Sequence, residues 1–342
     1  MSAKKSTKEP EGEELFVPEC GPEVSDCNPG TPAPNVAFPD LKLQQDVLDD
    51  APPEGLGVNL VNTRALVRTS AQRWKTRLSS YDPVEPVPCQ IIQITHETEH
   101  EWTFRVACEA KVKPGQFMQL SLPHFGESPI SVSGMHDGIL DFTLRAVGKV
   151  TDELFKLRPG DDVYVRGPYG NGWPMEQFKG KHLVVITGGT GIAPVRQMMT
   201  HFYHHMDEVI DVWTIHGFKD KASVLFLNDL TRFWKRFHTT LCLDNEEIPG
   251  WHQGFVTDYV KDIPFEDFGD DYEVVLVGPP PMMKFTGMAL LKRGAAEDHI
   301  WMSFERKMSC AIGKCGNCRI DSTYICLDGP VFPYSKAKYL VD

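Results

Sequence analysis

The chain has 342 residues, 41% hydrophobic and 24% charged, which is enough for two globular domains. Its formal net charge of −12 argues against nucleic acid or an anionic membrane as the main partner. The apolar runs are shorter than a membrane span, and no apolar segment follows the basic start of the chain. We therefore expect a cytoplasmic protein, in which clustered cysteines are better interpreted as metal ligands than as disulfides.

The first 85 residues carry few signals of regular structure. Twelve of the 26 prolines precede residue 89, and residues 1–53 hold eleven acidic but only four basic side chains. Such a segment buries too little apolar surface to offset its ordering entropy, so we expect it to be disordered or docked on a partner. Residues 64–77, with five basic and no acidic groups, are either an exposed helix or the docking element. Cys20 and Cys27 are interpreted as free thiols, with a ligand role as the alternative.

Short segments rich in β-branched and aromatic residues occupy residues 86–178. Gly and Pro separate six of them, and the alternation within each predicts antiparallel strands that form a small barrel. The six segments are 89–97, 102–109, 117–123, 129–134, 139–147 and 161–170.

Buried strands alternate with helical segments over residues 179–304. The strands are "HLVVIT", "VIDVWTIHG", "TTLCLD", "YEVVLVG" and "HIWMSF", and segments such as "APVRQMMTHFYHH" and "PPMMKFTGMALLKRG" lie between them. This alternation predicts a doubly wound parallel α/β domain that binds a nucleotide. Residues 305–342 follow as a small C-terminal subdomain, so the expected fold class is an α+β multidomain chain.

Two turns at the carboxyl ends of predicted strands are candidates for nucleotide binding. In "TGGTGIAP", glycines let the backbone approach a pyrophosphate, and the following helix offers unpaired N–H groups and a positive dipole end. The stiff turn in "GPPPMM" would form one wall of a nicotinamide pocket; ordinary strand-to-helix turns are the alternative for both. The candidate residues are Gly188, Gly189, Thr190, Gly191, Ala193, Pro194, Gly278, Pro279, Pro280, Met282 and Met283.

Four cysteines are crowded near the end of the chain, at Cys310, Cys315, Cys318 and Cys326. Structural zinc usually has two separated C-x2-C pairs, whereas this spacing begins with the C-x4-C-x2-C pattern of plant-type [2Fe–2S] centres. The small residues between the cysteines let backbone N–H groups face the inorganic sulfides. We therefore predict a [2Fe–2S] cluster held by the four thiolates, with zinc or free thiols as the alternatives.

A predicted barrel followed by "TGGTGIAP", "GPPPMMKF" and "FERKMSCAIGKCGNC" resembles the ferredoxin–NADP reductase superfamily. The last motif is similar to one branch of it. That branch holds the flavin subunit of anaerobic sulfite reductase, the gamma subunit of cytoplasmic NiFe hydrogenases (sulfhydrogenases) and the electron-transfer subunit of dihydroorotate dehydrogenase. The resemblance covers roughly residues 88–335 and leaves out the first 85 or so.

The resemblance implies that the barrel binds FAD. Where the family's flavin motif often has arginine, "GESPISVSG" has Ser128, a departure that favours the sulfite reductase and hydrogenase branch. The turn "RGPYGNGWP" resembles the family's connection from barrel to nucleotide domain, with a common Gly–Pro turn as the alternative. The implied flavin-binding residues are Pro129, Ile130, Ser131 and Val132, then Arg145 as the candidate cation, and Gly148, Val150 and Thr151 in the phosphate loop.

These sites suit electron transfer between NAD(P)H, FAD and a [2Fe–2S] cluster. A nicotinamide gives electrons in pairs, a cluster takes them singly, and a flavin does both. No Ser–His–Asp or paired-carboxylate arrangement stands out, so no catalytic residue is assigned and the terminal chemistry is expected on other subunits of a larger redox complex. The resemblance suggests a hydrogenase or a sulfite reductase. The alternatives are a dihydroorotate dehydrogenase partner and a non-catalytic nucleotide-binding scaffold with a zinc tail.

Further residues bear on specificity and packing. Lys219, Lys221 and Arg196 lie where a cation would favour the 2′-phosphate, which tips the balance slightly toward NADP. Glu305 lies either near the flavin or, as we expect, in a surface salt bridge. Structural roles are expected for His201, His204 and His205 on a helix surface and for Cys89, Cys108 and Cys242 as buried small hydrophobes.

Overall fold

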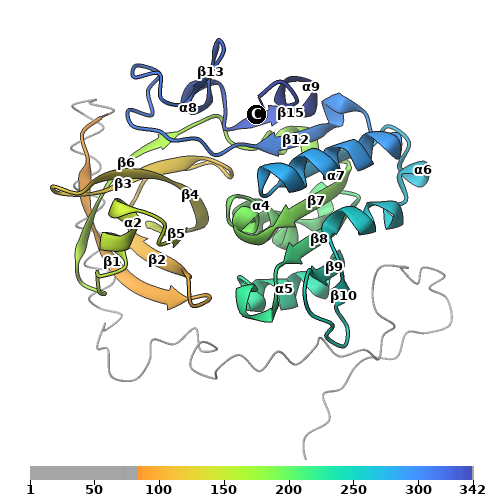
Figure 1. Ribbon diagram of the computed structural model, residues 1–342, viewed down its shortest axis with the longest axis horizontal. Helices are drawn as coiled ribbons and strands as arrows, with labels where there is room; N and C mark the ends of the chain where they lie inside the picture. The colour runs from red at the N-terminus through yellow and green to blue at the C-terminus, as the bar shows by residue number, and fades with distance from the viewer. Residues whose placement is uncertain (1–71, 73–83, 341–342) are drawn as a thin grey trace, which may run out of the picture.

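The computed structural model describes residue 72 and residues 84–340, and every structural statement below concerns these residues. Most of the N-terminal extension, including Cys20, Cys27 and nearly all of segment 64–77, lies outside the described residues. Figure 1 shows a barrel beside a sheet flanked by helices, with the segment that carries β13 and α8 along the upper edge.

The first body is a closed antiparallel barrel, which confirms the prediction of six strands. Its strands are β1 (Val87–His96), β2 (Glu101–Ala107), β3 (Phe117–Leu122), β4 (Gly126–His136), β5 (Ile139–Arg145) and β6 (Asp162–Tyr169), in the order β1-β2-β5-β4-β3-β6. Alternate side chains fill the interior: Met118 and Leu120 on β3 and Phe142 on β5 are at most 1% exposed. The short helix α2 (Lys149–Leu154) lies against β3 and β4.

The second body is a seven-stranded sheet with helices on it. Its strands are β7 (His182–Gly188), β8 (Asp211–Phe218), β9 (His238–Leu243), β10 (His252–Gln253), β11 (Tyr272–Val277), β12 (Ile300–Ser303) and β15 (Val331–Pro333), in the order β10-β9-β8-β7-β11-β12-β15. All neighbours are parallel except β12 and β15. The helices are α3 (Met175–Phe178), α4 (Ala193–His204), α5 (Leu227–Trp234), α6 (Phe265–Phe268) and α7 (Pro280–Lys292).

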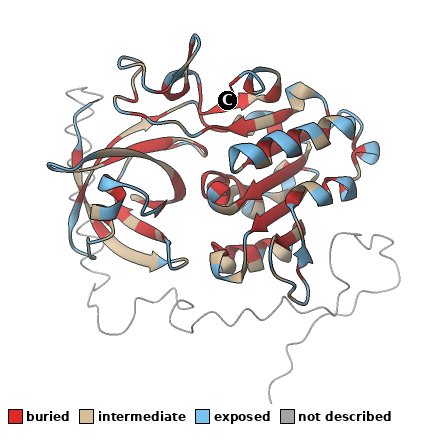
Figure 2. Ribbon diagram, viewed as in Figure 1, coloured by how far each residue is buried: buried red, intermediate tan, exposed pale blue. Residues whose placement is uncertain are grey.

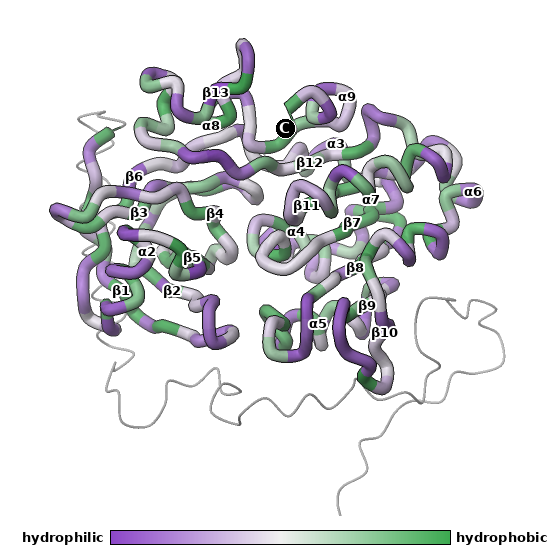
Figure 3. Tube along the Cα trace, viewed as in Figure 1, coloured by the Kyte–Doolittle hydropathy of each residue, from purple (hydrophilic) through white to green (hydrophobic). Residues whose placement is uncertain are grey.

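The central strands of this sheet are buried on both faces. On β7, Val184 and Ile186 belong to one hydrophobic layer, and Leu183 and Val185 belong to the other. This two-sided burial explains why the strands appear in the sequence as continuous apolar runs rather than alternating ones. Figure 2 shows the strands buried and the outer turns of the helices exposed, and Figure 3 shows hydrophobic residues gathered along strands such as β7 and β8. No helix in the described part of the chain has the length and apolarity needed to cross a membrane.

The cysteine segment, residues 304–330, leaves the seven-stranded sheet after β12 and returns to it at β15. It contains β13 (Arg319–Ile320), β14 (Thr323–Tyr324) and α8 (Ile325–Asp328), and α9 (Tyr334–Ala337) follows β15. A hydrogen bond from the Phe304 N–H to the Pro330 carbonyl (3.0 Å) closes its base. Because β15 pairs antiparallel with β12, the segment is a long loop out of the sheet, a connection that the sequence did not indicate.

Candidate functional site

The two predicted nucleotide-binding turns lie against each other at the carboxyl edge of the sheet. β7 ends at Gly188, and its neighbour β11 ends just before Gly278. The sulfur of Met282 is 2.4 Å from where a Cβ of Gly188 would lie and 2.3 Å from the corresponding position of Gly278. A Cβ on Gly191 would lie 2.5 Å from the carbonyl oxygen of Val277. The packing of the two turns therefore favours glycine at these positions, in addition to any role toward a pyrophosphate.

The other predicted residues of these turns fall into an accessible and a buried group. Half-buried or exposed at the edge are Gly189, Thr190, Pro279 and Pro280, whereas Ala193, Pro194 and Met283 are buried. The Pro194 carbonyl accepts a hydrogen bond from the indole N–H of Trp173 (2.9 Å), in the turn that leads out of the barrel. The buried group therefore fixes the turns, and the exposed group is open to a ligand.

The predicted flavin-binding strand is β4. Pro129, Ile130 and Ser131 are half-buried on it, and Ile130 packs against the barrel core. Val132 is 0% exposed and packs in the barrel core. The side chain of Val132 is therefore part of the barrel core, and the predicted flavin contact at this residue would involve its backbone.

The predicted phosphate loop lies beside the start of β4. A Cβ on Gly126 would lie 3.5 Å from the Val150 side chain. The Thr151 hydroxyl accepts hydrogen bonds from the N–H groups of Val147 (3.0 Å) and Gly148 (3.1 Å) and donates to the Gly148 carbonyl (3.0 Å). Thr151 therefore holds the loop in shape, and the space around Gly148 is open.

Arg145, the candidate cation for the flavin phosphates, lies at the end of β5 with its side chain 49% exposed. It forms an ion pair with Glu101, which lies directly opposite on β2 and whose side chain is 2% exposed. Much of the positive charge of Arg145 is therefore already balanced by Glu101.

The four cysteines converge in the cysteine segment. Cys315 contributes to the lowered pKa of the Cys310 thiol, and Cys318 and Cys310 contribute to the raised pKa of the Cys326 thiol, so the four residues lie near one another. Cys318 and Cys326 are buried, and Cys315 is exposed. Among residues 84–340, no three His, Cys, Asp or Glu side chains are grouped as they would be around one metal ion. The sulfurs thus approach one another as two pairs.

Backbone N–H groups point at two of the sulfurs. Cys310 Sγ accepts from the N–H groups of Ile312 (3.5 Å), Lys314 (3.3 Å) and Cys315 (3.3 Å), and Cys326 Sγ accepts from Gly313 N–H (3.3 Å). Burial would raise the pKa of the Cys310 thiol, but these N–H groups outweigh it and lower that pKa to about 7. At Cys310 the loop thus favours the thiolate form in which a cysteine binds a metal, whereas burial raises the pKa of the Cys326 thiol to about 12.

Positive φ angles let the loop wrap around the sulfurs. Ala311 (φ 59°), Gly313 (φ 72°) and Gly316 (φ 80°) have left-handed backbone conformations. A Cβ on Gly313 would lie 2.2 Å from Leu327 Cδ1, so a side chain here would have to displace Leu327 and adopt a backbone conformation that favours glycine. The small residues noted in the sequence therefore serve the backbone conformation and the packing of this loop.

Two barrel residues that sequence reasoning missed hold this segment. Arg166 on β6 donates hydrogen bonds to the carbonyls of Ser309 and Cys310 (both 2.8 Å), and Asn171 contacts the backbone after Cys326. The available signal was an arginine in an otherwise apolar strand, followed by the turn "GPYGN". The turn interpreted only as an interdomain connection also seats the cysteine segment.

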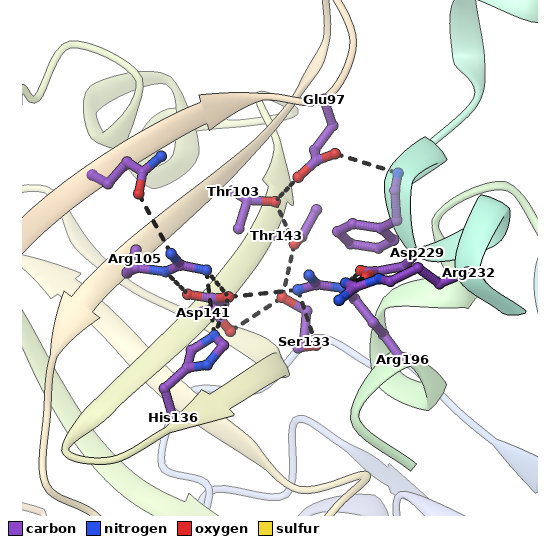
Figure 4. A network of polar contacts seen from close by, with 12 residues as sticks. Glu97, Thr103, Arg105, Ser133, His136, Asp141, Thr143, Arg196, Asp229 and Arg232 are labelled. Atoms are coloured by element: carbon purple, nitrogen blue, oxygen red, sulfur yellow. Dashed lines mark hydrogen bonds and ion pairs between the residues drawn. The ribbon is translucent and has the colours of Figure 1, made fainter. Parts of the chain in front are cut away.

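A buried polar network joins the barrel to helices of the second body (Figure 4). Asp141 on β5 is 0% exposed and accepts hydrogen bonds from Arg105 (2.9 Å), with His136 Nε2 at 3.2 Å. Arg196 of α4 lies 3.5 Å from Asp141 and 2.5 Å from Asp229 of α5. Arg196 therefore bridges carboxylates of the two bodies.

The charges of this network act on the carboxyl groups within it. Burial alone would raise the pKa of Asp141, but hydrogen bonds from His136 and Arg105 and the positive charges of Arg105 and Arg196 hold it far below its usual range. Glu97, at the other end of the network, behaves in the opposite way: burial is the largest effect and raises its pKa.

Arg196 was expected near the 2′-phosphate of a bound nucleotide, but its side chain forms ion pairs within the protein. Its guanidinium is committed to Asp229 and Asp141 and stacks 4.5 Å from the centre of the Phe226 ring. It therefore belongs to the contact between the two bodies and not to a ribose phosphate pocket.

The other residues discussed in the sequence analysis lie on the surface or in the core of the protein. Glu305 is exposed, and the ion pairs seen among the described residues do not include it. In the last turn of α4, His201 Nε2 lies 3.0 Å from the carboxylate of Glu208, which follows the helix. The three cysteines predicted as buried small hydrophobes are buried: Cys89 and Cys108 are 1% exposed and Cys242 is 0% exposed, although Cys108 lies just after β2 and not in a strand.

Two family models match the chain. Residues 185–287 match the oxidoreductase NAD-binding domain, and residues 305–338 match the iron–sulfur cluster binding domain of dihydroorotate dehydrogenase B. These matches coincide with the sheet that carries the glycine turns and with the cysteine segment.

Curated relatives and solved structures agree with this assignment. Sulfhydrogenase 1 subunit gamma of Pyrococcus furiosus is 33% identical over 249 residues, which are 70% of this chain and 82% of the relative. A probable dihydroorotate dehydrogenase B (NAD(+)) electron-transfer subunit of Methanocaldococcus jannaschii is 32% identical over 258 residues, covering 75% and 93%. The fold is similar, with a TM-score of 0.63 and 23% identity, to a chain of NADH-dependent reduced ferredoxin–NADP oxidoreductase, covering 74% and 92%.

Proposed function

The chain belongs to the family of electron-transfer reductase subunits that includes sulfhydrogenase gamma and dihydroorotate dehydrogenase B subunits, and we propose that it passes electrons between NAD(P)H, FAD and a [2Fe–2S] cluster. One observation carries the proposal. The cysteine segment connects β12 to β15, the last strand of the sheet whose edge holds the nucleotide turns, and Arg166 of barrel strand β6 donates a hydrogen bond to it. These contacts support an electron path through the three candidate sites.

Each group of residues has a defined task in this proposal. The backbone of Gly188–Gly191 and the exposed Pro279 and Pro280 bind and orient the nucleotide. Pro129 and Ser131, which alternate with the core-packed Ile130, face the flavin. The four thiolates hold the cluster, which fits the donor set and the N–H groups directed at Cys310 and Cys326. When bound, the flavin supplies the exchange between paired and single electrons.

The partner is proposed to be a catalytic subunit of a hydrogenase- or sulfite-reductase-type complex. The similarity to a sulfhydrogenase gamma subunit and Ser128 in the flavin motif support this choice. A dihydroorotate dehydrogenase partner is the second candidate, because the family model for residues 305–338 is described by that enzyme. Companion chains that co-purify with the protein from its native cell distinguish the two.

The nucleotide preference is proposed to be weak. Lys219 and Lys221 follow β8 and would attract the 2′-phosphate of NADP. Asp220 lies between them, and its charge contributes to the raised pKa of Asp244, after burial as the larger cause. With Arg196 engaged elsewhere, the opposing charges leave only a small advantage for either nucleotide, which KM values for NADH and NADPH measure.

Metal analysis and visible absorption of the purified protein test the proposed function. We expect iron and acid-labile sulfide, together with flavin and iron–sulfur absorption that bleaches when NADH or NADPH is added without oxygen. A colourless protein that contains zinc would instead indicate a nucleotide-binding scaffold with a zinc tail.

A further inference from the structure

The end of β6 and the turn after it hold both arms of the cysteine segment. Arg166 donates to the carbonyls of Ser309 and Cys310, at the first cysteine. Asn171 holds the other arm: its N–H donates to the Gly329 carbonyl (2.7 Å), and its side chain exchanges hydrogen bonds with the backbone of Val331 (2.8 and 3.2 Å). A stretch of six residues thus fixes a segment that lies more than a hundred residues away in sequence.

Arg166 uses its full hydrogen-bonding capacity, although it is only 3% exposed. Nε and Nη2 donate to the two carboxylate oxygens of Glu127 (2.7 and 2.5 Å). Nη1 donates to the Tyr169 hydroxyl (2.7 Å) and the Cys310 carbonyl (2.8 Å), and Nη2 also donates to the Ser309 carbonyl (2.8 Å). An arginine has five N–H donors, and all five are used. The single ammonium of a lysine could not reproduce this fork.

The fork controls the orientation of the loop around Cys310. The carbonyls of Ser309 and Cys310 point toward Arg166, and after the left-handed turn at Ala311 the following N–H groups point toward Cys310 Sγ. Hydrogen bonds of this kind, together with nearby charge, set the reduction potential of an iron–sulfur cluster. Glu127 lies on β4, two residues before Pro129, so the same ion pair connects the predicted flavin strand to the cluster loop.

We propose that Arg166 is a positioning residue that fixes the N–H···S hydrogen bonds at Cys310 and thereby sets the reduction potential of the cluster, with Glu127 balancing its charge. This inference rests on the proposed function, because it requires a redox-active cluster in the segment. Removing the fork loosens the N–H groups and removes a positive charge. Both changes disfavour the more negative reduced cluster and lower its potential. Removing only the Glu127 charge leaves Arg166 uncompensated and raises the potential.

The test uses the holoprotein with its flavin and cluster. Iron content, the EPR spectrum of the reduced cluster and its midpoint potential in a dye-mediated titration are measured for Arg166→Gln, Arg166→Lys and Glu127→Gln. The control is Arg236→Gln. Arg236 donates a hydrogen bond to the carbonyl of Tyr203 on helix α4. We expect a lower potential and an altered EPR spectrum in Arg166→Gln, a smaller shift in Arg166→Lys, a higher potential in Glu127→Gln and no change in the control.

Each result has a defined meaning. A wild-type potential and EPR spectrum in Arg166→Gln, with full iron content, overturns the inference. If Arg166→Gln loses its cluster, Glu127→Gln decides: a raised potential supports the inference, and an unchanged or lowered one overturns it. A wild-type protein that lacks iron overturns the proposed function itself, before any variant is compared.

Discussion

Gly191 and Val277 come so close that a Cβ on Gly191 would lie 2.5 Å from the Val277 carbonyl oxygen. The obstructing atom is backbone at the end of a central strand, which has no rotamer that moves it aside. We expect Gly191→Ala to lower the free energy of unfolding by about 1–3 kcal/mol, as overpacking does. We also expect NAD(P)H binding to weaken by about tenfold or more, since both turns must shift. Urea unfolding and nucleotide titration measure these effects, with the exposed Thr190→Ala as the stability control. Wild-type behaviour of Gly191→Ala would contradict the packing of the two turns.

Gly313 and Gly316 offer a matched pair for the cysteine segment. Both have positive φ, but a Cβ on Gly313 meets Leu327 at 2.2 Å, whereas nothing lies within 4 Å of one on Gly316. We expect Gly313→Ala to reduce the iron bound per chain strongly, because the N–H bond to Cys326 Sγ is displaced. Gly316→Ala adds only backbone strain of about 1 kcal/mol and retains most of the iron. Equal iron loss in both variants would show that the contact with Leu327 is unimportant.

Asp141 is the centre of the polar network between the two bodies. Asp141→Asn leaves Arg105 and Arg196 facing a neutral side chain in a buried site. We expect the free energy of unfolding to fall by about 3–5 kcal/mol, the range for breaking a buried ion pair. Glu153→Gln, which breaks the surface pair with Lys156, is the control and should cost less than about 1 kcal/mol. Chemical unfolding monitored by circular dichroism compares them; similar effects would argue against the network.

His216 makes stability depend on pH. Burial lowers its pKa to about 3, while Nδ1 remains hydrogen-bonded to the Thr187 hydroxyl (2.7 Å). The unfolded state therefore binds a proton that the folded state does not between about pH 6.5 and pH 3. The contribution of His216 is present in full above about pH 6.5 and is lost as pH falls, by up to about 1.4 kcal/mol per pH unit. We expect His216→Gln to reduce this slope in urea unfolding measured between pH 4 and 6. An unchanged slope would mean that His216 takes up a proton in the fold.

Local patterns in the sequence predicted the barrel and the parallel sheet because strand and helix periodicities recur over short stretches. Segment 117–123 alternates from Met118 onward because Met118 and Leu120 fill the barrel core between polar residues, although Phe117–Leu120 are all buried. Segment 182–187 does not alternate because β7 is buried on both faces. The glycine turns and the cysteine spacing were also visible, since each involves nearby residues.

Contacts between distant residues could not be predicted in this way. The hydrogen bond from Arg166 to Cys310 spans 144 positions, and nothing local to either residue indicates it. The return of the chain as β15 depends on three residues, too few for a periodic signal. The partners of Arg196 could not be predicted from nearby sequence either. The glycine turn before Arg196 suggested a phosphate ligand, whereas its partners Asp141 and Asp229 lie on other elements. The predicted domain boundary between residues 304 and 305 therefore divides the sequence but not the sheet. Strand β15, from residues after this boundary, completes the sheet formed by residues before it.

The central claim is that electrons from the nucleotide reach the cluster through this chain. The most direct measurement is an EPR spectrum of the isolated, flavin-loaded protein after NADH or NADPH is added without oxygen. The account predicts about two iron atoms per chain and the signal of a reduced [2Fe–2S] cluster, lost in Cys318→Ser. A protein whose flavin is reduced while its cluster stays oxidised, or whose cysteines hold one zinc ion, would contradict it.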